Sequence, residues 1–259
     1  MDYKSIKFYY INLEGSNTRR DNMEHMLTNL GLNYERFPAV KIADHENLTY
    51  TTRTLGDVSP ENVTNGKQPN FGAFGCLLSH LTIIEQNYDN PQPYVILEDD
   101  IDKNQFTHEW LRQFQHSVNT LIQDKEVSMV RPLTNGTATK NAKIHCISDK
   151  DHFVYTKKGY TYPEDIILKN TYMKNYVRCP IILDPKTKFT VGMGTPCCYI
   201  NNSRQVLNDI LDYLGKNKIN FLPIDRIYTG HVQNSYIYNG QVIWRDYVES
   251  DIKEVNKNK

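Results

Sequence analysis

Three acidic residues stand at the end of one apolar run, in the stretch PYVILEDDID at residues 93–102. Residues 94–97 are typical of a buried strand, and they lead directly into Glu98, Asp99 and Asp100. Carboxylates this close repel one another and raise each other's pKa unless a cation lies between them. Mg²⁺ and Mn²⁺ accept such oxygen ligands and fill their remaining positions with water or phosphate oxygens. The alternative is a strand end that enters solvent, where acids are common.

The start of the chain predicts a β-α-β unit. Residues 6–13 are nearly all apolar, as in a strand covered on both faces, and 34–40 predict a second strand. The helix between them begins at Ser16 or Asn17 and ends at Gly31. Its apolar face is formed by Met23, Met26, Leu27 and Leu30. Such units favour parallel, right-handed sheets, which bind ligands at the carboxyl ends of their strands.

Further elements are expected along the chain. Apolar residues recur at helical spacing in residues 71–88, 110–121 and 205–214. Short apolar runs predict strands at 127–130 and 219–225, and residues 41–70 predict a surface loop with short elements. In an extended chain, side chains alternate between faces. Glu98 and Asp100 should therefore point one way and Asp99 the other, unless the strand ends at Asp99 and the chain turns.

The composition excludes several classes of protein. The 259 residues carry 30 basic and 30 acidic side chains, so no nucleic-acid or anionic-membrane partner is expected. No run approaches the roughly 18 apolar residues of a membrane helix, and no signal peptide is recognised. We therefore expect a cytoplasmic protein, with peripheral membrane association left open. The five cysteines are odd in number and include no CxxC pair, so they predict buried thiols in place of disulfides or a zinc site.

Several sequence blocks carry a family resemblance. They are YYINLEGSNTRR, YERFPAV, FGCLLSH and YVILEDD, with weaker C-terminal blocks TPCCYINNSR and FLPID. In these blocks the chain resembles glycosyltransferase family 25 of lipooligosaccharide biosynthesis, which includes galactosyltransferases of bacterial surface glycans and of collagen. The strong part covers residues 8–100. The resemblance implies a GT-A fold, an α/β architecture with a Rossmann-like, mainly parallel sheet flanked by helices.

The resemblance also implies an activity: inverting, metal-dependent transfer of a hexose from UDP-galactose or UDP-glucose. The acceptor would be a glycan or a hydroxylated protein. Asp100 is the first expected ligand of Mn²⁺ or Mg²⁺, with Asp99 and Glu98 sharing metal, ribose or supporting contacts. The family's P-x-D pattern makes Asp225 the candidate catalytic base or an acceptor ligand. Enzymes of this fold often complete the metal site with a C-terminal histidine, here His231.

The UDP-sugar donor is expected to contact residues at the end of the first strand, on the first two helices and in the acidic stretch. The residues expected there are Asn12, Leu13, Arg19, Arg20, Gly75, Ser79, His80, Glu98 and Asp99. Arg19 and Arg20 can reach a diphosphate by charge-assisted hydrogen bonds, or they can form a solvated helix face. Ser79 and His80 are neighbours on a helix and do not face each other, which excludes a hydrolase. They suit hydrogen bonding to the donor sugar, with helix packing as the alternative.

We expect one domain over residues 1–250, in which 131–190 form an acceptor-side insertion, followed by a flexible tail at 251–259. Two other functions stay open. A catalytically silent module would bind UDP or a glycan without turnover. A sugar nucleotidyltransferase would share the sheet and the metal, but its Gly-rich loop after the first strand is missing from EGSNTRR.

Overall fold

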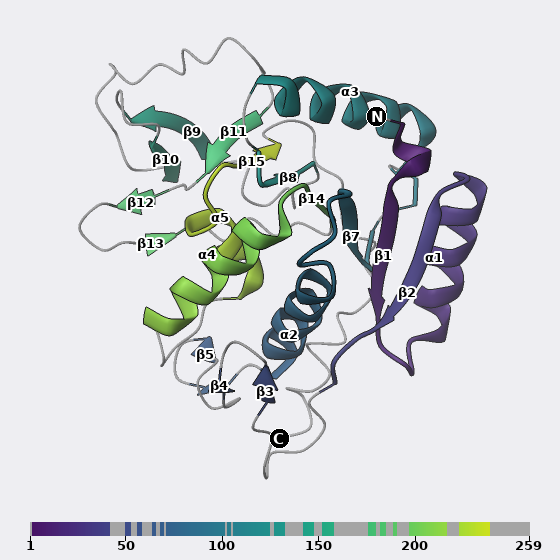
Figure 1. Ribbon diagram of the computed structural model, residues 1–259, viewed down its shortest axis with the longest axis horizontal. Helices are drawn as coiled ribbons and strands as arrows, with labels where there is room; N and C mark the ends of the chain where they lie inside the picture. The colour runs from purple at the N-terminus through teal and green to yellow at the C-terminus, as the bar shows by residue number, and fades with distance from the viewer. Residues whose placement is uncertain are drawn as a thin grey trace.

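The computed structural model has an α/β fold built on one seven-stranded sheet (Figure 1). It describes residues 2–41, 71–101, 103–104, 106–124, 127–132, 197–216 and 223–238, and the backbone of short strands in the intervening segments. Across the sheet the strands are β11 (Tyr176–Cys179), β15 (Ser235–Tyr238), β8 (Met129–Arg131), β14 (Cys197–Ile200), β7 (Tyr94–Glu98), β1 (Lys7–Asn12) and β2 (Asn33–Pro38).

The sheet is mixed, as the resemblance implied. β1 is parallel to β2 and to β7, and β15 is parallel to β8. β14 is antiparallel to both of its neighbours, β7 and β8, and β11 is antiparallel to β15. It follows that β2, β1, β7, β8 and β15 point one way and that only β14 and β11 of this sheet are reversed. The prediction of a mainly parallel sheet is confirmed.

The helices are a short 3₁₀ turn, η1 (Tyr3–Ser5), and α1 (Asn17–Asn29), α2 (Phe71–Gln86), α3 (His108–Asp124), α4 (Ser203–Lys216) and α5 (Ile224–Gly230). Four two-stranded pairs lie outside the main sheet: β3 (Tyr50–Thr52) with β4 (Gly56–Val58), β5 (Thr64–Asn65) with β6 (Gln68–Pro69), β9 (Ala142–Ile147) with β10 (His152–Lys157), and β12 (Ile182–Asp184) with β13 (Phe189–Thr190). None of the described helices combines the length and apolarity needed to cross a bilayer.

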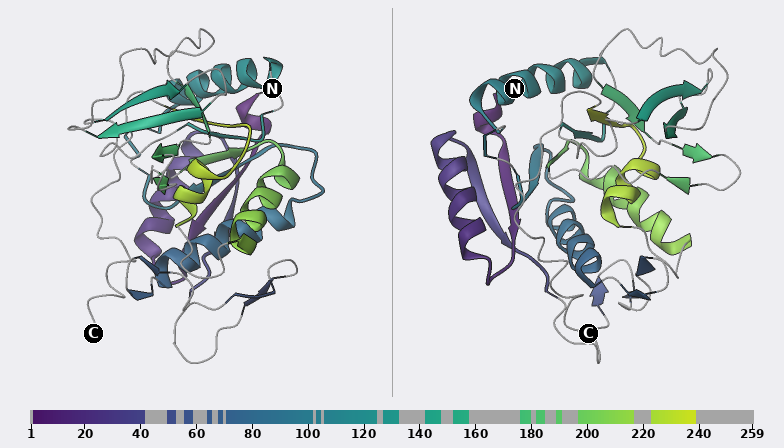
Figure 2. Two further views of the ribbon diagram at one scale, coloured as in Figure 1. Left: turned by 90° about the vertical axis from the view of Figure 1, so that its left-hand side faces the viewer. Right: turned by 180° about the vertical axis from the view of Figure 1, so that it is seen from behind.

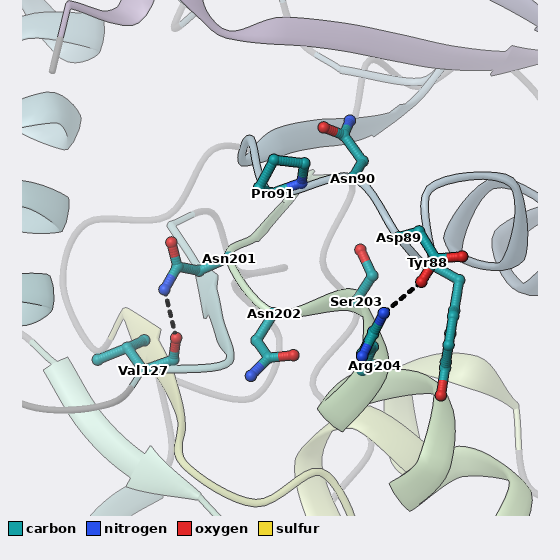
Figure 3. Close-up of a pocket in the computed structure, with 9 residues that line it drawn as sticks. All are labelled: Tyr88, Asp89, Asn90, Pro91, Val127, Asn201, Asn202, Ser203 and Arg204. Atoms are coloured by element: carbon teal, nitrogen blue, oxygen red, sulfur yellow. Dashed lines mark hydrogen bonds and ion pairs between the residues drawn. The ribbon is translucent and has the colours of Figure 1, made fainter.

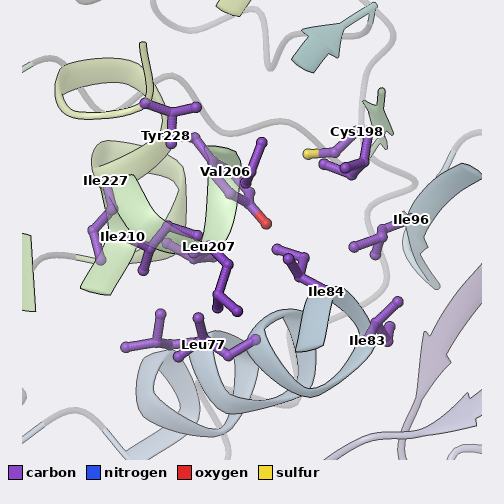
Figure 4. Packing of buried hydrophobic residues seen from close by; sticks show 14 of the residues in the cluster. Leu77, Ile83, Ile84, Ile96, Cys198, Val206, Leu207, Ile210, Ile227 and Tyr228 are labelled. Atoms are coloured by element: carbon purple, nitrogen blue, oxygen red, sulfur yellow. The ribbon is translucent and has the colours of Figure 1, made fainter. Parts of the chain in front are cut away.

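Helices cover both faces of the sheet, and α1 and α2 lie on opposite sides of β1 (Figure 2). The alternation of side chains along β7 separates two cores. Tyr94 and Ile96 belong to the core with α2, α4 and α5, whereas Val95 and Leu97 belong to the core with α1 and α3. Figure 4 shows the first core, where side chains of α2 and α4 meet Ile96 of the sheet. The strand is buried on both faces, which explains its unbroken apolar run.

The β-α-β unit forms as predicted. Met23, Met26 and Leu27 of α1 are buried, and the helix is followed by Gly31, whose φ of 63° lies in the left-handed region that favours glycine. Ser16 occupies the N-cap position, but its side chain makes no capping hydrogen bond. The backbone N–H of Ser16 instead donates to the carbonyl of Leu13 at 3.0 Å, so a turn leads from β1 into the helix.

The predicted strand at 219–225 is wrong at its carboxyl end. Pro223 is the N-cap of α5, and Asp225 lies in the first turn of that helix. Proline has no N–H and a fixed φ, and both suit a helix start. Residues 219–222 lie outside the described residues, as do the expected tail at 251–259 and much of the segment 131–190.

Candidate active site

The carboxyl ends of β1 and β7 lie side by side. Their parallel register pairs Ile11 with Glu98, which brings Asn12 level with Asp99. The Asn12 Nδ2 donates to Asp99 Oδ2 at 2.8 Å, so the last residue of one strand holds the first acid after the other. Ligands of open α/β sheets bind at this edge. Two of the residues expected to form a site, Asn12 and Asp99, therefore meet at this edge.

Asn12 is 1% exposed, and its amide is occupied within the protein. Besides the bond to Asp99, Nδ2 donates to the carbonyl of Ser16 at 3.2 Å. The Asn12 Oδ1 accepts from Arg36 Nε of β2 at 3.1 Å. An amide has two N–H donors, and both are used here. Asn12 therefore joins β1, β2 and the turn after β7, and it has no N–H left for a ligand.

Asp99 is also held by the first helix. Arg19 of α1 donates from Nη1 to Asp99 Oδ1 at 3.0 Å, and both side chains are only 12% exposed. An ion pair in a partly buried setting is screened less than one in open solvent. Arg20 lies elsewhere, since its Nη2 donates to Asn17 Oδ1 of its own helix at 2.8 Å. Of the two arginines singled out in the sequence, Arg19 is the one that reaches the acids.

The strand ends at Glu98, and the chain turns at Asp99 and Asp100. In this turn the side chains no longer alternate between the two faces of the sheet, and Asp99 and Asp100 line the same cavity. This cavity, of about 20 Å³, is also lined by Arg19, Asn22, Met23, Met26, Ile101 and Lys103. A cavity of this size, with charged side chains in its lining, has room for about one water molecule or ion.

Glu98 points to the other face of the sheet, toward α2. Its Oε1 lies 3.7 Å from His80 Nε2 and 3.9 Å from Cys76 Sγ. Cys76 and His80 are four residues apart on α2, so they share one helix face. His80 and Glu98 were predicted from the sequence to be site residues, whereas Cys76 was not. The i, i+4 spacing to His80 was the signal that could have identified it.

Gly75 and Ser79 fix the chain after β2 against α2. The Ser79 hydroxyl accepts from the Val40 N–H at 2.9 Å and donates to the Gly75 carbonyl at 2.7 Å. Ser79 is fully buried. A Cβ added to Gly75 would lie 2.4 Å from the Val40 carbonyl oxygen. These two residues therefore allow the close approach of a loop backbone to the helix.

Replacing Gly75 with alanine is expected to destabilise the protein by about 1–3 kcal/mol, because overpacking against a backbone carbonyl forces the chain to move. Thermal unfolding followed by circular dichroism measures the change. Gly215→Ala is the matched control, since Gly215 is also helical but has nothing within 4 Å of the added Cβ. Equal melting temperatures for the two variants would contradict the close contact at Gly75.

The first turn of α5 places Asp225 at the carboxyl edge of the parallel strands, next to the end of β8. Arg131, the last residue of β8, is fully buried, and its Nη1 donates to Thr229 Oγ1 at 2.7 Å and approaches the Asp225 carbonyl at 3.4 Å. β8 and β7 are separated by one strand, which corresponds to about 10 Å between them. Arg131 was missed in the sequence, although an arginine directly after the apolar run 127–130 was the signal.

His231 lies at the C-cap of α5, with its ring 4.1 Å from that of Tyr213 in α4. Burial lowers the pKa of His231, which favours the neutral imidazole. Leu13, also expected to contact the donor, is half-buried in the turn after β1. Within the described ranges, the one group of three possible metal-donor residues is Cys76, His80 and Glu98, so His231 is not brought together with the acids there.

A larger hollow, of about 480 Å³, lies at the opposite edge of the sheet (Figure 3). It is lined by residues that precede β7 and β8 and by residues that follow β14: Tyr88, Asp89, Asn90, Pro91, Val127, Asn201, Asn202, Ser203 and Arg204. Arg204 and Asp89 pair with each other, and Asn201 Nδ2 donates to the Val127 carbonyl at 2.8 Å. This is the amino edge of the parallel strands, so we place the active site at the carboxyl edge.

Residues 5–191 match the family model described as Glycosyltransferase family 25 (LPS biosynthesis protein). The chain belongs to glycosyltransferase family 25. The match to family 25 includes β1, α1, α2 and β7, and with them Asn12, Arg19, Asp99 and Asp100. Asp225 and His231 follow its end. No match was found among curated proteins.

Proposed function

We propose that this glycosyltransferase moves a hexose, galactose or glucose, from a UDP-sugar to a hydroxyl group of a glycan or protein acceptor, with inversion at the anomeric carbon. The observation that carries the proposal is the contact of Asp99 with Asn12 and Arg19 at the carboxyl ends of β1 and β7. Family membership supports sugar transfer, and the acids at this edge support a donor whose phosphates are bound with a divalent cation.

Asp100 and Asp99 line the same small cavity, and their carboxylates are of the ligand type that Mn²⁺ and Mg²⁺ prefer. When bound, such an ion acts as a Lewis acid on the leaving diphosphate. Asp100 would hold the cation. Asp99, held by Asn12 and Arg19, would fix the position of the turn, and the positive charge of Arg19 would lie close to the phosphate oxygens.

Asp225 is the proposed base. Its carboxylate would take the proton of the acceptor hydroxyl as that oxygen attacks the anomeric carbon. The new carbon–oxygen bond forms on the face opposite the nucleotide, and the bond to the diphosphate breaks with its electron pair leaving on UDP. The packing of α5 against Arg131 of β8 supports this assignment, because it holds Asp225 near the edge where the donor would lie.

UDP release tests the proposal directly. The protein is incubated with a panel of UDP-, GDP- and CMP-sugars, with Mn²⁺ or with a chelator, and free nucleotide is measured. Slow hydrolysis of the donor without an acceptor is expected for one UDP-sugar only, and only with the cation. Metal-dependent UDP binding without release from any sugar would point to a silent binding module. No release and no UDP binding by calorimetry would reject the proposal.

A further inference from the structure

A second group of donor atoms lies on the face of β7 opposite the small cavity. Cys76 Sγ, His80 Nε2 and a carboxylate oxygen of Glu98 all lie within 4.8 Å of one another. The helix spacing of Cys76 and His80 and the end of β7 create this group, although the three residues are separated in the sequence. It contains one sulfur, one nitrogen and one oxygen donor.

The imidazole of His80 is oriented by a buried partner. His80 is 1% exposed, and its Nδ1 lies 3.0 Å from the hydroxyl of Tyr228. The Nε2 of His80 is buried and has no hydrogen-bond partner among the described residues. A buried nitrogen in this state costs free energy unless a ligand satisfies it.

We propose that Cys76, His80 and Glu98 bind Zn²⁺, with a fourth coordination position open. In this arrangement Nδ1–H of His80 donates to Tyr228, and the lone pair of Nε2 faces the metal. Around tetrahedral Zn²⁺, an oxygen and a nitrogen donor are about 3.3–3.4 Å apart and an oxygen and a sulfur donor about 3.5–3.6 Å apart, from metal–ligand bonds of about 2.0–2.3 Å. The two distances from Glu98 Oε1, 3.7 Å to His80 Nε2 and 3.9 Å to Cys76 Sγ, exceed these values by only a few tenths of an ångström. Cys76 Sγ and His80 Nε2 lie within 4.8 Å of each other.

The donor set selects among cations. Thiolate and imidazole suit Zn²⁺, whereas Mn²⁺ and Mg²⁺ prefer oxygen ligands. Binding would replace the S–H bond of Cys76 with a Zn–S bond and release the proton to solvent. The site differs from the cavity of Asp99 and Asp100, because Glu98 points to α2 and those acids border α1. The proposal therefore stands on its own geometry and does not depend on the donor assigned above.

Protection of Cys76 from alkylation tests the site in the unmodified chain. Cys76 is half-buried, while Cys197 and Cys198 are fully buried and serve as internal references. The protein is treated with a thiol reagent after addition of Zn²⁺, Mn²⁺ or neither, and each cysteine is followed by peptide mass spectrometry. We expect Zn²⁺ to slow modification of Cys76 at least about tenfold and excess Mn²⁺ to have no effect. Equal rates under all three conditions would overturn the proposal.

The affinity for Zn²⁺, measured directly, provides a second test of the site. Competition with a chromophoric chelator should give one tight Zn²⁺ site per chain, weakened at least about tenfold in Cys76→Ser and in His80→Gln. His25→Gln is the matched control, because His25 is exposed on α1 and bonds Asn29. Co²⁺ should give a thiolate charge-transfer band that Cys76→Ser abolishes. Unchanged affinity in both variants, with an unchanged Co²⁺ spectrum, would contradict the assignment even if His80→Gln folds poorly.

Discussion

Asp100→Asn is expected to lower metal-dependent UDP release about 100- to 1000-fold, the range seen when a group that stabilises developing charge is removed. The substitution keeps the size of the side chain and removes the negative charge that would hold the cation. Asp100 lies in a turn and lines a small cavity, so the fold should survive. The measurement is the rate of UDP release over a range of Mn²⁺ concentrations, with the Mn²⁺ requirement expected to rise.

Asp212→Asn provides the control for Asp100. Asp212 is 65% exposed on α4 and pairs with Lys216 four residues on, so its loss should leave the rate and the Mn²⁺ requirement unchanged. The melting temperature of both variants is measured alongside. If Asp100→Asn keeps more than half of the wild-type rate at limiting Mn²⁺, the residue does not hold the cation.

Asp225→Asn is expected to lower kcat for transfer by about 10²- to 10⁴-fold, because a positioned base contributes on this scale. Donor binding should remain, since the proposed base acts on the acceptor. A base works only when deprotonated, so the wild-type rate should fall as the pH is lowered, and this fall should disappear in the variant. Initial rates with a sugar acceptor, measured from about pH 3.5 to pH 9 so that the ordinary range of an aspartate pKa is covered, report both effects.

Asp100→Asn and Asp225→Asn can be told apart by calorimetry with UDP and Mn²⁺. The first should weaken metal-dependent UDP binding, and the second should leave it intact. Thr229→Val tests the support of Asp225 separately, because it removes the hydroxyl that accepts from Arg131 while leaving the Asp225 carboxylate in place. A variant of Asp225 with wild-type kcat and an unchanged pH profile would show that another group takes the proton.

Much of the fold can be predicted from local sequence. The apolar run of β7 and the spacing of Met23, Met26 and Leu27 in α1 are local patterns, and the structure confirms both elements. The prediction of a strand at 219–225 was wrong at its carboxyl end, because a short run of apolar residues suits a strand or a buried helix turn equally well. Pro223, which starts α5, was the competing signal.

The candidate site was harder to predict than the elements. The acids after the buried strand were expected at the carboxyl edge of the sheet, and they lie there. Arg19 was expected to reach a diphosphate, and in the structure it pairs with Asp99. Side-chain alternation predicted that Glu98 faces away from Asp99. The sequence did not reveal that Asn12 uses both N–H groups of its side-chain amide within the protein, or that Glu98 meets Cys76 of α2. These facts depend on where the strand ends and on which side chains from other elements arrive there.

The sequence by itself determined the secondary structure of the first strand, first two helices and β7, the family and the position of the acids, because each depends on residues close together in the chain. Only the tertiary structure decided which polar groups meet. Asp99 and Asn12 are 87 residues apart, and Arg131 and Thr229 are 98 apart. Such contacts are fixed by strand order, register and helix packing, which bury the polar groups together and require each to find a partner.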